Sequence, residues 1–464
     1  MAIILLVLAG AIALDEQVDK PVRRVVAEVQ TPMGARPDAR SSAFFCTGGT
    51  AAAEGAANGT VVVANAGNRP ISGSVTVVPN EGDARAVTVQ VPAAGRAAVT
   101  LTEVVTAPYA SALVELDGGQ AVVELAASGP LGESISPCAS AASTRWYFAE
   151  GITTRDATEI LTLFNPFPED AVVDMVFNTE EGEVTPQALT GLSVRGRGML
   201  AINVGDHVQR RESVATRVSA RVGRLVVGRL QTLDGSVARK GMSVQLGAAA
   251  PGDVWYFPEG FLTDGLTERF QLFNPSRDEA QVQVELTLEQ GSAEPIALTV
   301  PGESRVTLSA NDEARIPKNV PHAVIVRSTN GVGVLVERTI DATTPSPRSG
   351  LAITVGARVA STQAVVAAGQ VDESTEQLVV VHNISSRPAR VTVTLLDNGA
   401  RVVPPSLDRI EVGPRQRRAI RLADIRRGPT PLLVSSTEPV VVERDLYKLR
   451  APGTAMSVAI PLRP

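Results

Sequence analysis

Aromatic side chains are scarce in this sequence: Phe, Trp and Tyr together make up 3% of its 464 residues. Hydrophobic residues nevertheless reach 44%, so Val, Ala, Leu and Ile must fill the cores. Valine-rich runs such as TVVVAN, LVVVHN and PVVVERD favour strands over helices. The 31 Pro and 39 Gly argue against long helices. The composition therefore predicts an all-β fold, and the chain length predicts about three or four domains.

Lysine and histidine are also rare, which limits the chemistry to be expected. The net charge is −6 and only four Lys occur, so the excess of positive charge that nucleic-acid binding needs is absent. The three His (His207, His322 and His382) fall at non-matching positions without metal-ligand spacing. No G-x-S-x-G elbow, P-loop or dinucleotide fingerprint is present. We expect no catalytic residue, no cofactor, no metal site and no nucleic-acid partner.

Cysteine occurs only twice, at Cys46 and Cys138, and no Cys-x-x-Cys is present. The two thiols lie at opposite ends of one unit, which predicts a disulfide within that unit and an oxidising compartment. Cys46 stands where Phe148 and Phe257 stand in later repeats, and Cys138 lies near the position of Gly247.

The N-terminus carries an apolar run of thirteen residues, Ala2–Leu14, followed by basic residues rather than preceded by them. Its length and its AIA triplet suit a signal peptide, whereas the basic n-region is missing. We interpret residues 1–40 as a truncated signal peptide or membrane anchor plus linker, through which alone the protein would meet a membrane. The alternative is a short apolar strand.

A long internal repeat organises the rest of the chain. In each copy an apolar strand runs into an Asn and an alternating strand follows, and the four Asn are spaced by 100, 109 and 109 residues: Asn65, Asn165, Asn274 and Asn383. About 60 residues later a matching strand follows in each copy, marked by Glu124, Arg229, Glu337 and Glu443. Strands broken by Gly, Pro or Asn every 8–12 residues are typical of β-sandwiches. We predict four tandem immunoglobulin-like modules of about 105 residues: module 1 (41–140), module 2 (141–250), module 3 (251–357) and module 4 (358–464).

The repeat also carries a family resemblance. WYFAEG at Trp146 and WYFPEG at Trp255 each open a module, with weaker versions FFCTGG at Phe44 and VVAAGQ at Val365. This pattern resembles a family of actinobacterial secreted proteins of unknown function. The resemblance implies an exported, envelope-associated protein and brings no catalytic residue.

Several repeated residues have both a structural and a binding interpretation. We expect the four Asn to cap turns, and the two Trp to fill cores or domain junctions rather than stack on sugars. Acidic residues gather at the module entrances and could hold Ca²⁺ there, although no recognised ligand spacing occurs: Glu150, Asp156, Glu159, Glu259, Asp264, Glu268, Asp372, Glu373 and Glu376.

One local cluster of positive charge stands out between Arg409 and Arg427, where seven Arg face two acids. It suits an anionic polymer or lipid headgroup, with these candidate residues on one exposed face: Arg415, Arg417, Arg418 and Arg421. The alternative is an edge strand protected from aggregation by its charge.

These observations lead to one expectation of function and two alternatives. We expect an exported, non-enzymatic, four-module rod that acts as a structural or adhesive component of the cell envelope, with an envelope polymer or protein as partner. The first alternative is a carbohydrate- or anionic-polymer-binding accessory for envelope glycan assembly. The second is a hydrolase whose site leaves no motif.

Overall fold

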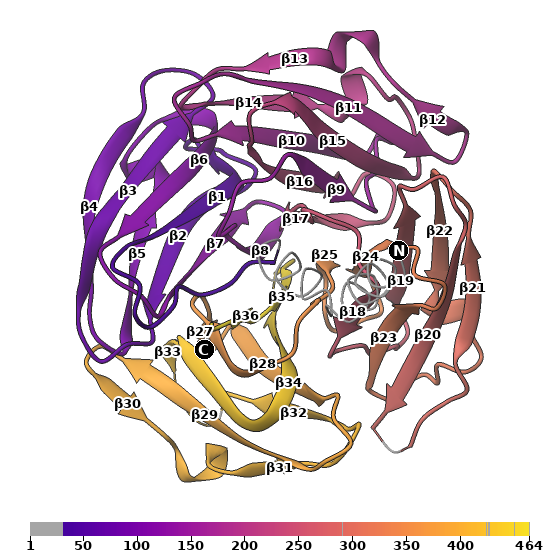
Figure 1. The fold of residues 1–464 in the computed structure, drawn as a ribbon. Helices are drawn as coiled ribbons and strands as arrows, with labels where there is room; N and C mark the ends of the chain where they lie inside the picture. Colours follow the sequence, from indigo (N-terminus) through magenta and orange to yellow (C-terminus); the bar gives the residue numbers. More distant parts are fainter. Residues whose placement is uncertain (1–30, 290, 424, 426, 450, 464) are drawn as a thin grey trace, which may run out of the picture.

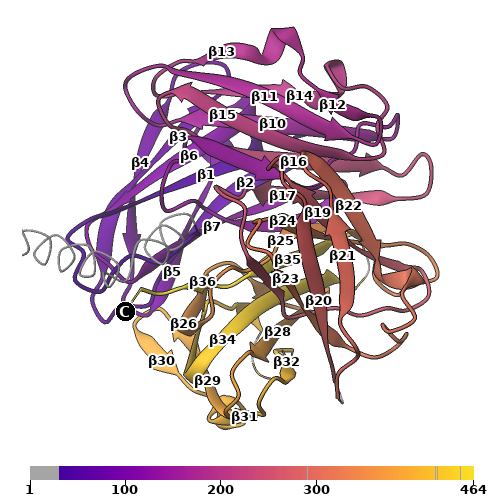
Figure 2. The same cartoon turned by 45° about the vertical axis from the view of Figure 1, so that its right-hand side comes forward.

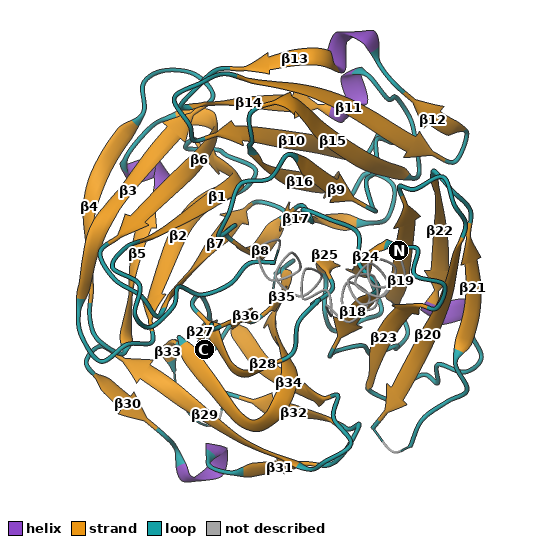
Figure 3. Ribbon diagram, viewed as in Figure 1, coloured by secondary structure: helices purple, strands orange, loops and turns teal. Residues whose placement is uncertain are grey.

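The computed structural model describes residues 31–464 except 290, 424, 426, 450 and 464. Strands dominate the described residues, and their helical segments are five 3-10 turns of three residues each (Figure 3): η1 (Leu101–Glu103), η2 (Gln187–Leu189), η3 (Val204–Asp206), η4 (Ala310–Asp312) and η5 (Pro405–Leu407). Within this part of the chain, no helix has the length and apolar character needed to cross a membrane. The all-β prediction is confirmed, while most of the predicted signal peptide or anchor lies outside the described residues.

Modules 1 and 2 each contain two packed groups of strands. In module 1 the outer group is β4 (Arg85–Val91), β3 (Ile71–Pro79), β6 (Ala107–Leu116) and β1 (Ser42–Ala51), and the inner group is β5 (Gly95–Thr100), β2 (Asn58–Asn65), β7 (Ala121–Gly129) and β8 (Gly132–Pro137). In module 2 the outer sheet is β12 (Gly182–Val184), β13 (Thr190–Val194), β11 (Ala171–Thr179), β15 (Val214–Val222) and β9 (Arg145–Phe148), and the inner sheet is β14 (Gly198–Asn203), β10 (Ala157–Asn165), β16 (Val226–Asp234) and β17 (Lys240–Leu246).

Modules 3 and 4 repeat this plan. In module 3 the outer sheet is β21 (Ile296–Val300), β20 (Ala280–Leu288), β23 (His322–Ser328) and β18 (Val254–Phe257), and the inner sheet is β22 (Ser304–Ser309), β19 (Leu266–Asn274), β24 (Leu335–Ala342) and β25 (Gly350–Val355). In module 4 the long strand β34 (Leu432–Lys448) joins both groups: β30 (Ala400–Val402), β31 (Ile410–Val412), β29 (Ala389–Asp397), β26 (Ser361–Val366) and β36 (Ile460–Pro461) outside, and β32 (Arg417–Arg421), β28 (Thr375–Asn383) and β35 (Thr454–Val458) inside. A small pair, β27 (Gln370–Val371) with β33 (Gly428–Pro429), completes module 4. Multiple antiparallel sheets of this kind are consistent with β-sandwich modules.

The burial of each strand follows its place in the module. On the outer strand β20, Val282, Val284 and Leu286 are buried while Gln283 between them is exposed, as the alternating pattern predicts. On the inner strand β2, consecutive residues Val61, Val62 and Val63 are all at most 4% exposed. The strand β2 is an unbroken valine run because both of its faces are buried. The outer strands of its own module cover one face, and module 4 covers the other.

The four modules form a closed ring, not the rod of separate beads that we expected. The strands β8, β17, β25 and β35 meet around a common axis, each packed against the equivalent strand of the next module. Figure 1 shows the first module (indigo) beside the last (yellow), and Figure 2 shows the same neighbourhood from a second direction. The amide of Gly34 also donates to the carbonyl of Pro461 at 2.8 Å, which ties the two ends of the described chain together.

The central strands are joined partly by serine side chains. The amide of Val244 donates to Ser134 Oγ at 2.9 Å, and the amide of Ile353 donates to Ser243 Oγ at 3.0 Å, so each serine binds the strand of the next module. At the junction between modules 3 and 4, Gly350 approaches the last module so closely that a Cβ atom would lie 3.1 Å from the amide nitrogens of Gly453 and Thr454. Gly350 also has a φ of 129°, which favours glycine.

The four repeated Asn make one pattern of hydrogen bonds. In each module the Asn side chain accepts from the amide two residues later, and its Nδ2 donates to the carbonyl four residues later and to a carbonyl 26 to 29 residues later. All four side chains are at most 1% exposed. The turn-capping interpretation of Asn65, Asn165, Asn274 and Asn383 is confirmed.

Replacing Asn274 with Ala should therefore lower the free energy of unfolding by about 1–3 kcal/mol, because the carbonyls of Asp278 and Val300 lose a buried donor. Urea unfolding followed by far-UV circular dichroism would measure the loss. The matched control is Asn330→Ala, since Asn330 makes similar bonds but is exposed. An equal loss in both variants would contradict the burial argument.

The predicted disulfide is present. Cys46 and Cys138 are bonded, with Cα atoms 4.5 Å apart. In module 2 the equivalent positions hold Phe148 and Gly247, and a Cβ atom on Gly247 would lie 2.8 Å from the Phe148 ring. The disulfide of module 1 thus occupies the space that an aromatic ring over a glycine fills in module 2.

Candidate functional site: the junctions between modules

Charged side chains are buried where one module meets the next. Glu124, Glu337 and Glu443 occupy one position of the inner sheets, each facing the residue three before the Asn of its module. The next residue along the strand is Arg338 in module 3 and Arg444 in module 4. Module 2 has Gly228 at the glutamate position, followed by Arg229. All six charged side chains are 0% exposed.

The junction between modules 2 and 3 shows how these residues are used. Arg229 Nη1 lies 3.1 Å from Glu337 Oε2, and it also donates to the carbonyl of Glu150. The same glutamate oxygen accepts from the amides of Ala149 and Glu150 at 3.1 and 2.7 Å. The WYFAEG segment of module 2 is therefore the loop that receives the glutamate of module 3. We call the Glu–Arg pair together with this loop a latch.

The latch recurs at the next two junctions. Between modules 3 and 4, Arg338 pairs with Glu443 and donates to the carbonyl of Glu259 in the WYFPEG loop. Between modules 4 and 1, Arg444 Nη1 lies 3.2 Å from Glu124 Oε2. That oxygen accepts from the amides of Ala367 and Ala368 at 3.0 and 2.6 Å, in the VVAAGQ segment. The repeated WYFAEG-type segment thus forms a docking loop. The latch between modules 4 and 1 closes the ring.

A second arginine reinforces the latch from the edge strand of the following module. Arg305 on β22 binds the carboxylate of Glu150, and its Nε donates to the carbonyl of Ala149 at 2.7 Å. Arg417 on β32 binds Glu259 in the same way, and its Nε donates to the carbonyl of Pro258 at 3.2 Å. Charge-assisted bonds of this kind offset the cost of burying the ions.

The junction between modules 1 and 2 has no latch. The arginine position holds Leu125 and the glutamate position holds Gly228. A Cβ atom on Gly228 would lie 2.9 Å from the carbonyl oxygen of Thr47, so the docking loop packs directly on the strand. The hydroxyls of Thr47 and Thr162 are 2.7 Å apart there. Apolar side chains of both modules share one core at this junction, so close packing replaces the ion pair.

Burial raises the pKa of two carboxyls near the junction between modules 2 and 3. The pKa of Glu150 rises because the group is desolvated, although Arg305 opposes the shift. Desolvation raises the pKa of Glu159 from 4.5 to about 8, and Arg229 only partly offsets it. Neither oxygen of Glu159 has a hydrogen-bond partner. The equivalent Glu268 lies 2.9 Å from His322 Nε2, and Gln377 accepts from the hydroxyl of Thr430 at 2.6 Å.

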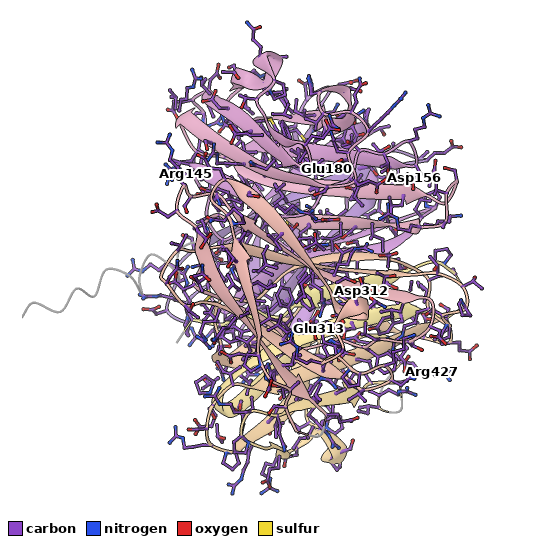
Figure 4. The ribbon with its side chains drawn as sticks, turned by 90° about the vertical axis from the view of Figure 1, so that its right-hand side faces the viewer. Arg145, Asp156, Glu180, Asp312, Glu313 and Arg427 are labelled. Atoms are coloured by element: carbon purple, nitrogen blue, oxygen red, sulfur yellow. A yellow bond between two sulfur atoms is a disulfide. The ribbon has the colours of Figure 1, made fainter. Side chains whose placement is uncertain are left out.

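The structure separates the four arginines that we expected on one exposed face. Arg415, Arg418 and Arg421 are exposed, and Arg421 Nε lies 2.8 Å from Glu376. Arg417 is only 8% exposed and is bound to Glu259, so its assignment to a surface patch is wrong. The strand β32 lies at the edge of its sheet, as the charge-protection alternative requires. Figure 4 labels the side chain of Arg427, and its Nη1 lies 2.9 Å from Glu373 Oε1.

The other candidate binding residues are also placed by the structure. Trp146 and Trp255 are 2% and 1% exposed, and each indole donates to a buried carbonyl at 2.8 Å, so both are core residues and not sugar platforms. Glu150, Glu159, Glu259 and Glu268 are buried, and no group of three metal-ligating side chains occurs among the described residues. Asp156 is buried as well, so five of the nine acidic residues at the module entrances are buried.

An apolar hollow of about 70 Å³ lies at one end of the ring axis. The ends of β17, β25 and β35 line it together with Thr31 and Pro32. Five Ala and two Gly contribute to its walls, and Trp255 and Arg358 also line it, with the guanidinium 5.4 Å from the indole centre. Thr354 contributes a buried hydroxyl without a hydrogen-bond partner. The hollow is too small for a large ligand.

In the sequence, the latch residues stood out only as markers of the repeat and not as ion pairs. Glu124, Arg229, Glu337 and Glu443 marked equivalent strands, and Arg305 was not singled out. The signal that was present is a charged pair inside a valine-rich strand, as in GVLVERT and PVVVERD, because an ion is rarely buried in a sheet without a partner.

Several solved structures show a weak likeness to the chain. The chain is similar to a Thermotoga maritima protein (crystal structure of "Thermotoga maritima 1070") with 18% identity, a TM-score of 0.21, and coverage of 23% of this chain and 94% of that one. It is similar to the Anabaena sensory rhodopsin transducer with 23% identity, a TM-score of 0.18, and coverage of 19% and 84%. It is similar to a tetra-tandem repeat from the extending region of a large adhesion protein with 14% identity, a TM-score of 0.11, and coverage of 90% and 98%. These scores are low, and no property is transferred.

A search of curated proteins finds no match. The sequence profile described as "Family of unknown function (DUF5719)" matches twice, at residues 126–308 and 247–450. The two matches overlap, as expected when one profile fits an internally repeated chain in two registers, and together they cover more than half of it. The chain belongs to this family of unknown function.

Proposed function

We propose that the protein is an exported, non-enzymatic structural or adhesive component of the cell envelope, of the actinobacterial secreted type. Its four immunoglobulin-like modules of about 105 residues would form one rigid ring, joined to the envelope through residues 1–40. The observation that carries the proposal is the latch. Three junctions bury the same Glu–Arg pair on the same docking loop, so the charged residues that recur in the sequence serve to assemble the ring.

The disulfide supports the exported location. Such bonds persist in oxidising compartments and are rare in the cytosol. The bond joins β1 to the residue that follows β8 in module 1, and both cysteines are at most 2% exposed.

Fractionation of cells that express the full-length protein tests both points. We expect the protein in the envelope or medium fraction, with Cys46 and Cys138 bonded in non-reducing mass spectrometry. A cytosolic protein with two alkylatable thiols would contradict the proposal. Reduction before alkylation is the control that shows both thiols can be detected.

A polymer-binding accessory is the second candidate function. An open hollow of about 590 Å³ on module 1 favours it, because hydroxyl, amide and carboxylate groups line the hollow: Ser42, Ser72, Ser74, Thr88, Gln90, Glu115 and Asp117. Two acids there suit a neutral glycan better than an anionic one. The exposed Arg415 and Arg418 on module 4 suit an anionic polymer. Sedimentation with purified envelope glycans distinguishes this candidate, because a purely structural ring would remain in the supernatant.

A further inference from the structure

The closing junction, between modules 4 and 1, keeps the second arginine of the latch but lacks its carboxylate. Arg305 and Arg417 each face the residue before the Asn of their module, and Arg96 on β5 occupies the same position opposite Ala64. Arg305 binds Glu150 and Arg417 binds Glu259. The docking loop that Arg96 reaches has Ala368 in place of this glutamate, and Arg96 Nη1 donates instead to the carbonyl of Gly369 at 3.3 Å.

Among the three latches, the closing junction is the one with more arginines than acidic residues at the equivalent positions. Two arginines face three acidic positions between modules 2 and 3, and two face three between modules 3 and 4: Arg229 and Arg305 with Glu337, Glu150 and Glu159, then Arg338 and Arg417 with Glu443, Glu259 and Glu268. At the same positions of the closing junction Arg444 and Arg96 face Glu124, whereas Gln377 and Ala368 stand at the other two acidic positions. A buried cation is stabilised by a compensating anion, and a half-buried one gains from an anion that water would otherwise replace.

A further arginine lies at the closing junction, and the neighbouring Asn398 Oδ1 accepts from the backbone amide of Arg96 at 3.4 Å rather than from its guanidinium. Arg401 crosses it and donates from Nη2 to the carbonyl of Ala66. Two nitrogens of Arg444, Nε and Nη2, are buried without a hydrogen-bond partner. Burial lowers the pKa of the Arg96 guanidinium, and no carboxylate raises it again. Arg96 is half-buried and Arg401 is exposed, so this side of the junction is open to solvent.

We propose that the closing junction binds an anion with a single carboxylate or phosphate group on Arg96, in the place that the carboxylates of Glu150 and Glu259 take at the other two latches. The planar guanidinium presents paired donors that fit either group. The bound anion would complete the third latch and so strengthen the contact that closes the ring. The inference stands on the junction geometry and does not depend on the proposed function.

Thermal unfolding and titration calorimetry of the full-length protein test the site. The probes are sodium phosphate and sodium acetate, with sodium chloride added to hold the ionic strength constant. We expect a saturable rise in Tm and a one-to-one binding isotherm, and the stronger of the two responses identifies the preferred group. Arg96→Gln should weaken binding at least tenfold, because the recognising guanidinium is lost.

Ala368→Glu is the sharper variant, since it installs the carboxylate of modules 2 and 3. It should raise Tm in the absence of the probes and abolish the response to them. If this variant does not fold, Arg96→Gln decides the question alone. The control is Arg415→Gln combined with Arg418→Gln, which removes exposed charge elsewhere on module 4 and should leave the response unchanged.

Three results would overturn the proposal: no saturable response in the unmodified protein, an unchanged response in Arg96→Gln, or loss of the response in the Arg415/Arg418 control. The last result would move anion binding to the exposed arginines at the start of β32 and just before it.

Discussion

Replacing Glu124 with Gln should cost about 3–5 kcal/mol of stability and loosen the contact between the first and last modules. Arg444 is 0% exposed, and Glu124 is the acid that pairs with it. The neutral amide would leave that guanidinium buried without a counter-charge. It would also weaken the bonds from the amides of Ala367 and Ala368, which now end on a carboxylate oxygen. The loss should appear in urea unfolding, together with a larger radius of gyration in small-angle scattering.

A double-mutant cycle separates the ion pair from the general cost of mutation. Arg444→Leu alone strands a buried carboxylate and should cost as much as Glu124→Gln, whereas the two changes together should cost much less than their sum. The chain itself offers the precedent, because the latch positions between modules 1 and 2 hold Leu125 and Gly228. Additive losses, or an unchanged radius of gyration in all three variants, would show that the latch does not hold the ring closed.

The strands of each module were predictable because their signals are local. Valine runs ending in Asn recur with the same turn chemistry, and the alternation of β20 places Val282 and Val284 in the core. The disulfide was predictable from the repeat register, which put Cys46 and Cys138 on the first and last strands of one unit.

The closure of the ring had no local signal. The contact between β8 and β35 joins residues more than 300 positions apart, and short linkers between modules are compatible with a rod as well as a ring. What decides between them is the rotation from one module to the next, because head-to-tail contacts close only when that rotation completes a circle. The three glutamates and one glycine at the equivalent position of the four modules do not reveal this angle.

The sequence indicated that the latch charges have partners, but it did not show which residues those partners are. Charge in a valine-rich strand indicates a buried partner, yet Arg229 and Glu337 lie 108 residues apart and belong to different modules. Arg417 was misassigned because its neighbours Arg415 and Arg418 are exposed, and composition alone does not show which arginine of a cluster points inward.

Glu159 makes the stability of the protein depend on pH in a direction unusual for a carboxylate. Its oxygens are buried without hydrogen-bond partners, and desolvation raises its pKa from 4.5 to about 8. Between these values the native state holds a proton that the unfolded chain releases. The native state therefore binds more protons than the unfolded one, and stability falls as pH rises through this window.

Glu159→Gln should remove this loss and stabilise the protein at pH 9 by up to about 5 kcal/mol, since each unit of pKa shift corresponds to about 1.4 kcal/mol. Below pH 4.5 the variant and the unmodified protein should be equally stable, because the carboxyl is then neutral in both states. Module 4 supports the substitution, as Gln377 occupies the equivalent position. Urea unfolding from pH 4 to pH 9 measures the effect, with the exposed Glu180→Gln as control. Parallel curves for Glu159→Gln and the unmodified protein would show that Glu159 is ionised in the native state and that another group stabilises its charge.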